Sequence, residues 1–431
     1  MEIVPEIRRL RPSATLAINE LVTQKRKNGE TVYHMGFGES PFPVHPRIKR
    51  ALCEHADKKY YSPTQGFISL RKQISLFYKE VTKLNYEAKQ IIVALGSKSL
   101  IFHAIASLEG PLLLPTPSWV SYQHQAYLLH KKVIYMQTSL QSSYLLTPSL
   151  LLASIEKTRL DLSRQKILLL NYPCNPTGQS YSKDQLQRLV PILRKNRIIV
   201  ISDEIYSLIT FNGHEHHSLA ELYPEGTIIT GGFSKDRSLG GYRLGVLLLP
   251  KGNDDLKRSI LSIISEIWSS ASSPIQYAAI EAYMPDEELL TYIHNCTKIH
   301  GIMTNYVYNR LKEAGISCLS PKGGFYLFPD WNNKKKMLDK MNLTTSKKLA
   351  KYLLKKYNIA TLPGSEFGMP KKHMSLRISP VDYDGTIILN EYLKRKTEID
   401  QNPTKFITEF APNLVYATDR LIDFTNSLLS D

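Results

Sequence analysis

The sequence is poor in cysteine, and its four cysteines, Cys53, Cys174, Cys296 and Cys318, lie far apart with no CxxC pair. This spacing excludes a disulfide framework, predicts no metal site and is typical of a reducing compartment. No apolar run approaches the ~20 residues that a membrane-spanning helix needs. The first residues include early acids and no apolar segment, unlike a signal peptide. We therefore expect a soluble, cytoplasmic protein with no membrane contact.

The composition is that of an ordinary globular protein, with 42% hydrophobic and 22% charged residues in 431. A chain of this length can bury a large core, and two domains are expected. The formal net charge of +16 would suit an acidic partner such as nucleic acid. The lysines are scattered, however, and no zinc-finger spacing or RNA-binding aromatic motif accompanies them. We therefore favour a solvated basic surface and expect no nucleic-acid partner.

Short apolar runs that end in polar, Gly- or Pro-containing turns recur between residues 91 and 249. They are 91–95, 112–114, 167–170, 198–201, 227–230 and 246–249. Their two-sided hydrophobicity is typical of strands in a sheet that is covered on both faces. Helical patterns, such as Leu186 to Lys195, lie between most of them. This alternation predicts an α/β fold with a mostly parallel sheet.

The chain after about residue 288 has a different pattern. A long helical stretch leads to a strand-like segment at 323–328, and another short strand is expected at 375–378. We expect a large domain at 46–287 and a smaller α+β domain made of 1–45 and 288–431. Its tail, 396–431, is expected to pack as a helix on the body.

Candidate chemical residues follow five of the apolar runs. They are Gly96-Ser97-Lys98, Thr116-Pro117-Ser118-Trp119, Asn175, Asp203 and Lys235. Ligands bind open α/β sheets at the carboxyl ends of the strands, so this shared placement predicts a single site.

Lys235 is the strongest of these candidates. It follows an apolar strand and a turn of small residues, with Ser234 before it and Arg243 shortly after it. An amine that can bond an aldehyde, beside a serine and an arginine that can hold a phosphate, indicates a pyridoxal-phosphate lysine.

An ordered set of motifs accompanies this lysine. They are Arg11-Pro12-Ser13-Ala14-Thr15, Gly38-Glu39, Tyr61-Ser62-Pro63-Thr64-Gln65-Gly66, Pro115-Thr116-Pro117-Ser118-Trp119-Val120-Ser121-Tyr122, Asn175-Pro176-Thr177-Gly178, Ser202-Asp203-Glu204-Ile205-Tyr206, Ser234-Lys235, Pro363-Gly364 and Arg377-Ile378-Ser379. The set resembles the class I aminotransferases, which are fold-type-I pyridoxal-phosphate enzymes, and most of all their bacterial aspartate aminotransferase branch. The resemblance runs from about Arg8 to about Leu393. It implies a seven-stranded sheet flanked by helices, and pyridoxal 5'-phosphate as cofactor.

The predicted catalytic residues are Lys235, Asp203 and Tyr206. Lys235 would hold the aldehyde and move a proton between the substrate Cα and the cofactor C4′. Asp203 would keep the pyridine nitrogen protonated. The resemblance implies that Tyr206 and Asn175 contact the phenolic oxygen and that Trp119 stacks on the ring. The structural alternatives are a helix N-cap for Asp203, a turn for Asn175 and core packing for Trp119.

The predicted phosphate site is the turn Gly96-Ser97-Lys98 together with Ser234 and Arg243. Backbone amides at the start of a helix after Gly96 would add to it. The resemblance implies that Tyr61 reaches the phosphate of a neighbouring subunit, and hence a homodimer. Ordinary packing is the alternative for Tyr61.

The resemblance also implies where a substrate binds. Arg377 would clamp the α-carboxylate with two parallel hydrogen bonds, near the backbone of Gly38 and the side chains of Trp119 and Asn175. A surface salt bridge is the alternative for Arg377.

A second substrate carboxylate is implied by Lys98 together with Thr15, which points to aspartate, glutamate or a similar dicarboxylate. Arg11 would serve larger acids such as prephenate. A surface lysine without a ligand is the alternative for Lys98.

The predicted function is amino transfer from an amino acid to a 2-oxo acid such as 2-oxoglutarate, in two half-reactions. A β-eliminating or other non-transaminating enzyme would use the same lysine, aspartate and arginine. A ligand-sensing regulator is the alternative of another class. It typically carries a DNA-binding domain ahead of this fold, and a resemblance that starts at about residue 8 leaves no room for one.

Replacing Lys235 with alanine tests the central assignment. We expect Lys235→Ala to lose the visible absorbance of covalently bound cofactor and the spectral change on adding an amino-acid donor, because no amine remains to bond the aldehyde. Absorbance scans of wild type and variant, with each amino acid added in turn, check this. An unchanged cofactor spectrum in Lys235→Ala would contradict it.

Overall fold

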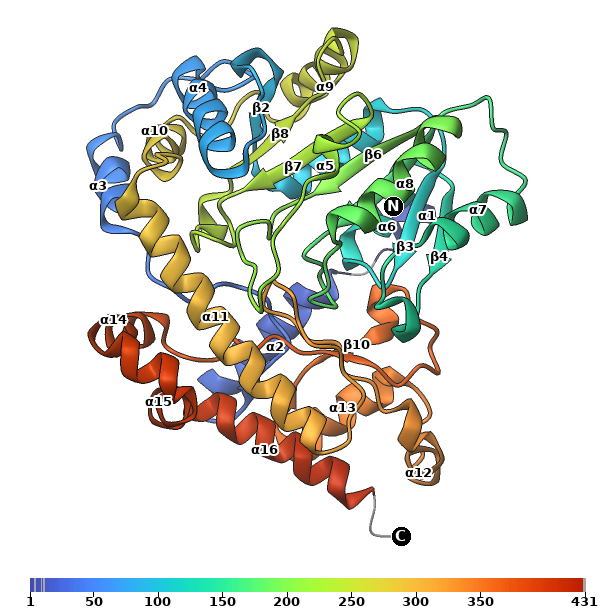
Figure 1. Ribbon diagram of the computed structural model, residues 1–431, viewed down its shortest axis with the longest axis vertical. Coiled ribbons are helices and arrows are strands. Elements are labelled where there is room, and N and C mark those ends of the chain that lie inside the picture. Colours follow the sequence, from blue (N-terminus) through green and yellow to red (C-terminus); the bar gives the residue numbers. More distant parts are fainter. Residues whose placement is uncertain (4, 9, 11, 429–431) are drawn as a thin grey trace.

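The computed structural model describes residues 1–3, 5–8, 10 and 12–428 (Figure 1). Its central element is a seven-stranded sheet in the order β2-β8-β7-β6-β5-β3-β4. The strands are β2 (Ile91–Ala94), β3 (Leu112–Thr116), β4 (Val133–Gln137), β5 (Lys166–Asn171), β6 (Ile198–Asp203), β7 (Thr227–Gly232) and β8 (Gly245–Leu248). β8 is antiparallel to both of its neighbours, and the other pairs are parallel. The predicted seven-stranded, mostly parallel sheet is confirmed.

Two strand assignments differ from the sequence pattern. β4 shows no continuous apolar run because it is an edge strand, whose residues alternate between more and less buried positions. The strand expected at 323–328 is wrong. That segment makes isolated bridges instead, Gly323 with Thr210 and Leu327 with Ile378, so its apolar side chains fill a core without a continuous ladder.

Helices cover both faces of the sheet because its inner strands are apolar on both sides. In β5, Ile167 and Leu169 pack into one hydrophobic cluster, while Leu168 and Leu170 pack into another. The first cluster includes α5 (Gly96–Ser107), α6 (Val120–Leu128) and α9 (Asp254–Ile267), and the second includes α7 (Pro148–Lys157) and α8 (Lys183–Lys195).

The N-terminal segment joins the C-terminal part through backbone pairing, because β1 (Tyr33–His34) runs parallel to β9 (Ile359–Ala360). Within the C-terminal part, β10 (Leu362–Pro363) is antiparallel to β11 (Leu376–Arg377). The pairing of β1 with β9 supports the predicted small domain of 1–45 and 288–431, whose boundaries stay a prediction.

The other helices and turns connect these parts. They are α1 (Pro5–Arg8), α2 (Ala14–Lys27), α3 (Pro46–Glu54), α4 (Ile68–Phe77), η1 (Tyr78–Thr82), η2 (Ala88–Gln90), η3 (Leu140–Ser142), η4 (Leu219–Glu221), η5 (Gly240–Tyr242), α10 (Ser273–Ala282), η6 (Asn332–Lys334), α12 (Lys335–Lys340), α13 (Ser346–Tyr357) and η7 (Gly364–Phe367). Among the described residues, no helix is both long and apolar enough to span a bilayer.

The tail forms helices that lie along the long helix α11 (Glu287–Glu313) (Figure 1). These helices are α14 (Gly385–Gln401), α15 (Pro403–Phe410) and α16 (Pro412–Ser427). On α16, Thr425 accepts a hydrogen bond from the buried Trp331 indole at 3.0 Å, and Asp419 pairs with Arg310 of α11 at 2.8 Å. The tail is therefore part of the packed core of this half.

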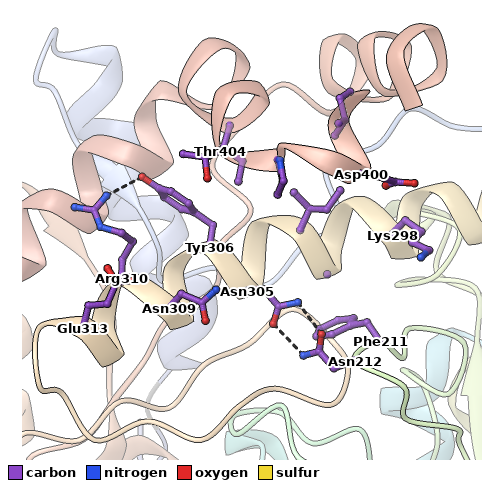
Figure 2. A pocket seen from close by; sticks show the side chains of 15 residues that line it. Phe211, Asn212, Lys298, Asn305, Tyr306, Asn309, Arg310, Glu313, Asp400 and Thr404 are labelled. Atoms are coloured by element: carbon purple, nitrogen blue, oxygen red, sulfur yellow. Dashed lines mark hydrogen bonds between the residues drawn. The ribbon is translucent and has the colours of Figure 1, made fainter. Parts of the chain in front are cut away.

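A groove of about 450 Å³ runs between α11, the loop at 211–212 and the start of α15 (Figure 2). Asn212 and Asn305 exchange two amide hydrogen bonds of 2.9 and 2.8 Å across it. Arg310 donates to the hydroxyl of Tyr306 at 3.0 Å. The first pair ties α11 to the loop at 211–212 and the second lies within α11, while Arg310 also reaches Asp419 of α16.

Leu421 of α16 tests how much the tail stabilises the fold. It is fully buried, so Leu421→Ala should lower the free energy of unfolding by about 2–5 kcal/mol, through lost burial and the cavity left behind. The matched control is Leu393→Ala on α14, where the side chain is 54% exposed and little change is expected. Urea unfolding of both variants measures the difference. An equal loss of unfolding free energy in both variants would mean that the burial of Leu421 in α16 adds no specific stabilisation.

Candidate active site

The carboxyl ends of the parallel strands open onto a cavity of about 460 Å³. Its lining includes twelve of the residues predicted from the sequence: Thr15, Gly38, Ser97, Lys98, Trp119, Asn175, Asp203, Tyr206, Ser234, Lys235, Arg243 and Arg377. They come from opposite ends of the chain, and the fold brings them to one place.

Lys235 lies in the turn after β7, with its Nζ donating to the backbone oxygen of Gly38 at 2.7 Å. Burial lowers the pKa of this amine to about 8, and the nearby carboxylate of Glu39 opposes the shift. A substantial neutral fraction is therefore present near physiological pH, as a nucleophilic amine requires.

Asp203 ends β6 and is buried at the cavity wall. Its Oδ2 accepts a hydrogen bond from the Tyr122 hydroxyl at 2.6 Å, and its Oδ1 accepts one from the Ile205 amide at 3.3 Å. Burial raises the pKa of Asp203 to about 6, and these donors oppose the rise. The helix N-cap alternative is wrong, because a turn, not a helix, follows at 205–208.

The predicted phosphate site combines a helix start with a cation. Gly96 begins α5, and its φ of +79° is in the left-handed region that favours glycine. A Cβ on Gly96 would lie 2.5 Å from Nη2 of Arg243, so the guanidinium sits directly over the helix start. Ser97 and Ser234 also line the cavity here. Amides at a helix start, two hydroxyls and a guanidinium fit the phosphate of pyridoxal phosphate.

Tyr206 and Asn175 each make a hydrogen bond to a side chain of the C-terminal part. The Tyr206 hydroxyl shares a 2.7 Å hydrogen bond with that of Tyr326. Asn175 accepts at Oδ1 from Nη1 of Arg377 at 3.2 Å, and its backbone amide donates to Asn171 Oδ1 at 2.8 Å. Asn175 thus lies in a turn, as the structural alternative predicted, and it also lines the cavity.

Arg377 is 1% exposed, which excludes the surface salt-bridge alternative. Its guanidinium donates to the backbone oxygen of Gly36 and lies over the rings of Tyr326 and Phe367, 4.9 and 5.3 Å from their centroids. Its Nε has no hydrogen-bond partner, and no carboxylate pairs with it in the part of the chain that the structure describes. A buried cation without an anion is costly, so the site is electrostatically prepared for a carboxylate.

Lys98 provides a second cation in the same cavity. Its Nζ lies 5.2 Å from the ring centroid of Trp119, and burial lowers its pKa, with a further contribution from Arg243. Thr15 lines the cavity near it, and its hydroxyl shares a 2.8 Å hydrogen bond with that of Ser13. Lys98 lies in the first turn of α5 and lines the cavity, and its contact with a substrate carboxylate stays a prediction.

One predicted side chain lies outside this cavity, and another residue falls outside the described part of the chain. Tyr61 is 91% exposed and does not line the cavity of its own chain. Arg11 lies outside the described residues.

Eight lining residues had no predicted role, among them Glu39, Tyr122 and Tyr326. Tyr122 stands three positions after Trp119, so the spacing of one helical turn was a usable signal. Tyr326 belongs to the segment 323–328, where the expected strand does not form, and Glu39 belongs to the motif Gly38-Glu39. A Cβ on Gly38 would overlap the Tyr326 hydroxyl at 2.1 Å, so a glycine is required there.

Comparisons with known proteins agree with this geometry. The family model described as aminotransferase class I and II matches residues 30–385. An aspartate aminotransferase of Bacillus subtilis is 32% identical over 381 residues, covering 86% of this chain and 93% of that protein. A bifunctional aspartate aminotransferase and glutamate/aspartate-prephenate aminotransferase of Petunia hybrida is 32% identical over 384 residues, covering 85% and 77%.

Solved structures show the same fold. The aspartate aminotransferase of Thermus thermophilus with maleate has a TM-score of 0.83 at 21% identity, covering 98% of this chain and 99% of that one.

The fold and the cavity therefore define a pyridoxal-phosphate-dependent enzyme of fold type I. The chain belongs to the class I and II aminotransferases, and it is a transaminase that uses pyridoxal 5'-phosphate. The ligand-sensing regulator suggested by the +16 charge is thereby set aside. Among the described residues, no group of three His, Cys, Asp or Glu side chains could hold a metal ion.

The lowered pKa of Lys235 predicts how pH controls cofactor attachment. Below about pH 8 the amine is mostly protonated and cannot attack, so the rate at which the cofactor-free protein takes up cofactor should rise through about pH 8 and then level off. Glu39→Gln removes a carboxylate that favours the protonated amine, so the midpoint should move to lower pH. Stopped-flow absorbance measures both profiles. A midpoint near pH 10.5, the ordinary lysine range, would contradict the assignment.

Proposed function

We propose that this aminotransferase takes its amino group from an acidic amino acid, aspartate or glutamate, and passes it to 2-oxoglutarate. The observation that carries the proposal is a pair of cations, Arg377 and Lys98, in one cavity, with no ion pair to either within the described ranges. Each of these substrates has two carboxylates, one for each cation. The aspartate aminotransferase of Bacillus subtilis, at 32% identity, supports the same choice.

Five side chains would hold the cofactor ring. Lys235 would carry it, Asp203 would pair with its nitrogen, Asn175 and Tyr206 would face its phenolic oxygen, and Trp119 would cover one face. The bound cofactor supplies an aldehyde that takes up the amino group and a ring that accepts electrons from Cα.

The remaining chemistry would belong to Lys235 and Arg377. Arg377 would fix the α-carboxylate so that the Cα–H bond points at the freed amine of Lys235. That amine would take the proton from Cα and return it at C4′ of the cofactor in the first half-reaction, and reverse this with 2-oxoglutarate in the second. Its lowered pKa suits both proton removal and proton delivery.

The functional unit would be a homodimer in the cytoplasm. Tyr60 and Tyr61 are 78% and 91% exposed, and two adjacent exposed tyrosines are typical of an interface. Tyr61 would then reach the phosphate in the partner's cavity. The cysteines are all free, which supports a reducing compartment.

Lys98→Met tests the substrate assignment. With Lys98 gone, the second carboxylate loses a charge-assisted hydrogen bond worth about 1.5–3 kcal/mol, so the single-turnover efficiency with aspartate should fall about 10- to 100-fold. The half-reaction with alanine, which has no second carboxylate, should change little.

Lys89→Met is the matched control, because Lys89 is a surface lysine that pairs with Glu87 away from the cavity. Equal losses with aspartate and alanine in Lys98→Met would assign Lys98 to cofactor binding and overturn the proposal. Product analysis with a donor that carries a leaving group on Cβ, such as cysteine, separates the two reactions, because transamination keeps the Cβ substituent in the oxo acid and β-elimination releases it with pyruvate and ammonia.

A further inference from the structure

Tyr122 and Asp203 form a short hydrogen bond between buried side chains at the cavity wall. The hydroxyl lies 2.6 Å from Oδ2, and the two residues are 1% and 3% exposed. Tyr122 stands in the first turn of α6, whose N-cap residue is Trp119. The rings of Trp119 and Tyr122 pack edge to face, with 5.2 Å between their centroids. One helical turn thus presents an indole to the cavity and a phenol to the carboxylate.

We propose that Tyr122 is a positioning residue that holds Asp203 as a carboxylate and fixes its orientation toward the cofactor ring. The inference rests on the proposed role of Asp203 at the ring nitrogen. It assigns to Tyr122 a function in catalysis without contact to the reacting atoms.

The surroundings of Asp203 explain why such a donor is needed. Burial favours the neutral acid and raises the pKa of Asp203 to about 6, and the neighbouring Glu204 pushes the pKa in the same direction. Cys174 and Tyr206 also lie close to it, and Lys235 supplies a nearby cation. The Tyr122 hydroxyl is the foremost group that opposes the burial penalty, ahead of the longer bond from the Ile205 amide.

A hydroxyl is suited to this task because it stays protonated. Burial raises the pKa of Tyr122 well above its ordinary value, so it remains a donor across the working pH range. A neutral Asp203 could not hold a proton on the ring nitrogen by charge, and the ring would lose much of its capacity to accept electrons from Cα.

Tyr122→Phe removes the hydroxyl and keeps the ring. In the full-length chain without cofactor, ¹³C NMR of labelled aspartate should show the Asp203 carboxyl titrating at higher pH than in wild type, with the signal identified by its loss in Asp203→Asn. In the loaded enzyme, cofactor affinity and kcat should each fall about tenfold with little change in the donor KM. The acid limb of the kcat profile should move toward neutral pH.

Tyr223→Phe is the matched control. Tyr223 is also a buried tyrosine whose hydroxyl donates to strand β6, at the Ile198 oxygen 3.1 Å away and at the opposite end of the strand from Asp203. It should leave the carboxyl titration and the acid limb unchanged. Should the phenylalanine variant fold poorly, 3-fluorotyrosine at position 122 gives a stronger donor of similar size, and the carboxyl should then titrate at lower pH.

An unchanged carboxyl titration in both variants overturns the proposal, as does the same shift in Tyr223→Phe. In the Asp203→Asn background, Tyr122→Phe should add no further loss of cofactor affinity, and an additive loss would show that the tyrosine acts through packing. The carboxyl titration needs no substrate, so it decides the role of Tyr122 even if wild type fails to use acidic amino acids.

Discussion

The parallel register of β5, β6 and β7 is the constraint on which the site depends. Asn171 pairs with Asp203, so β5 and β6 end level with one another, and Asp203 pairs with Thr230 of β7, which continues to Gly232 just before the turn that carries Lys235. Side chains that follow these ends must converge, whatever their distance along the chain. A register slip of one residue in β6 would turn Asp203 to the opposite face of the sheet. The buried apolar side chains on both faces of these strands hold that register.

The charged side chains of the site come from different parts of the fold according to their sign. The cations proposed to meet substrate or phosphate come from a helix start, a turn and the C-terminal part: Lys98, Arg243 and Arg377. The carboxylate of Asp203 comes from the sheet itself. Burial disfavours charge at Asp203, Lys235 and Lys98; the Tyr122 hydroxyl opposes this effect at Asp203, and the Glu39 carboxylate opposes it at Lys235.

Much of this arrangement could be predicted from the sequence. The same physical reasons explain which parts could not be predicted. Inner strands are apolar on both faces, so β5 and β6 stand out, and the residues after them were placed in the cavity. β4 was not recognised because an edge strand needs no such run. The bond from Tyr122 to Asp203 depends on how α6 lies against the end of β6, which no linear spacing states. The role proposed for Tyr61, which is exposed in a single chain, involves a second chain.

The unpaired guanidinium of Arg377 also has a consequence for the folded state of the empty enzyme. Burying this cation without an anion makes the free protein less stable than a core filled with apolar side chains would be. Under the role proposed for Arg377, an entering carboxylate would relieve that deficit, so part of the affinity for substrate would come from destabilisation stored in the fold. Stability and turnover are therefore opposed at this position. A chain selected only for heat resistance would be under pressure to lose this arginine, and a chain selected for transamination must tolerate it.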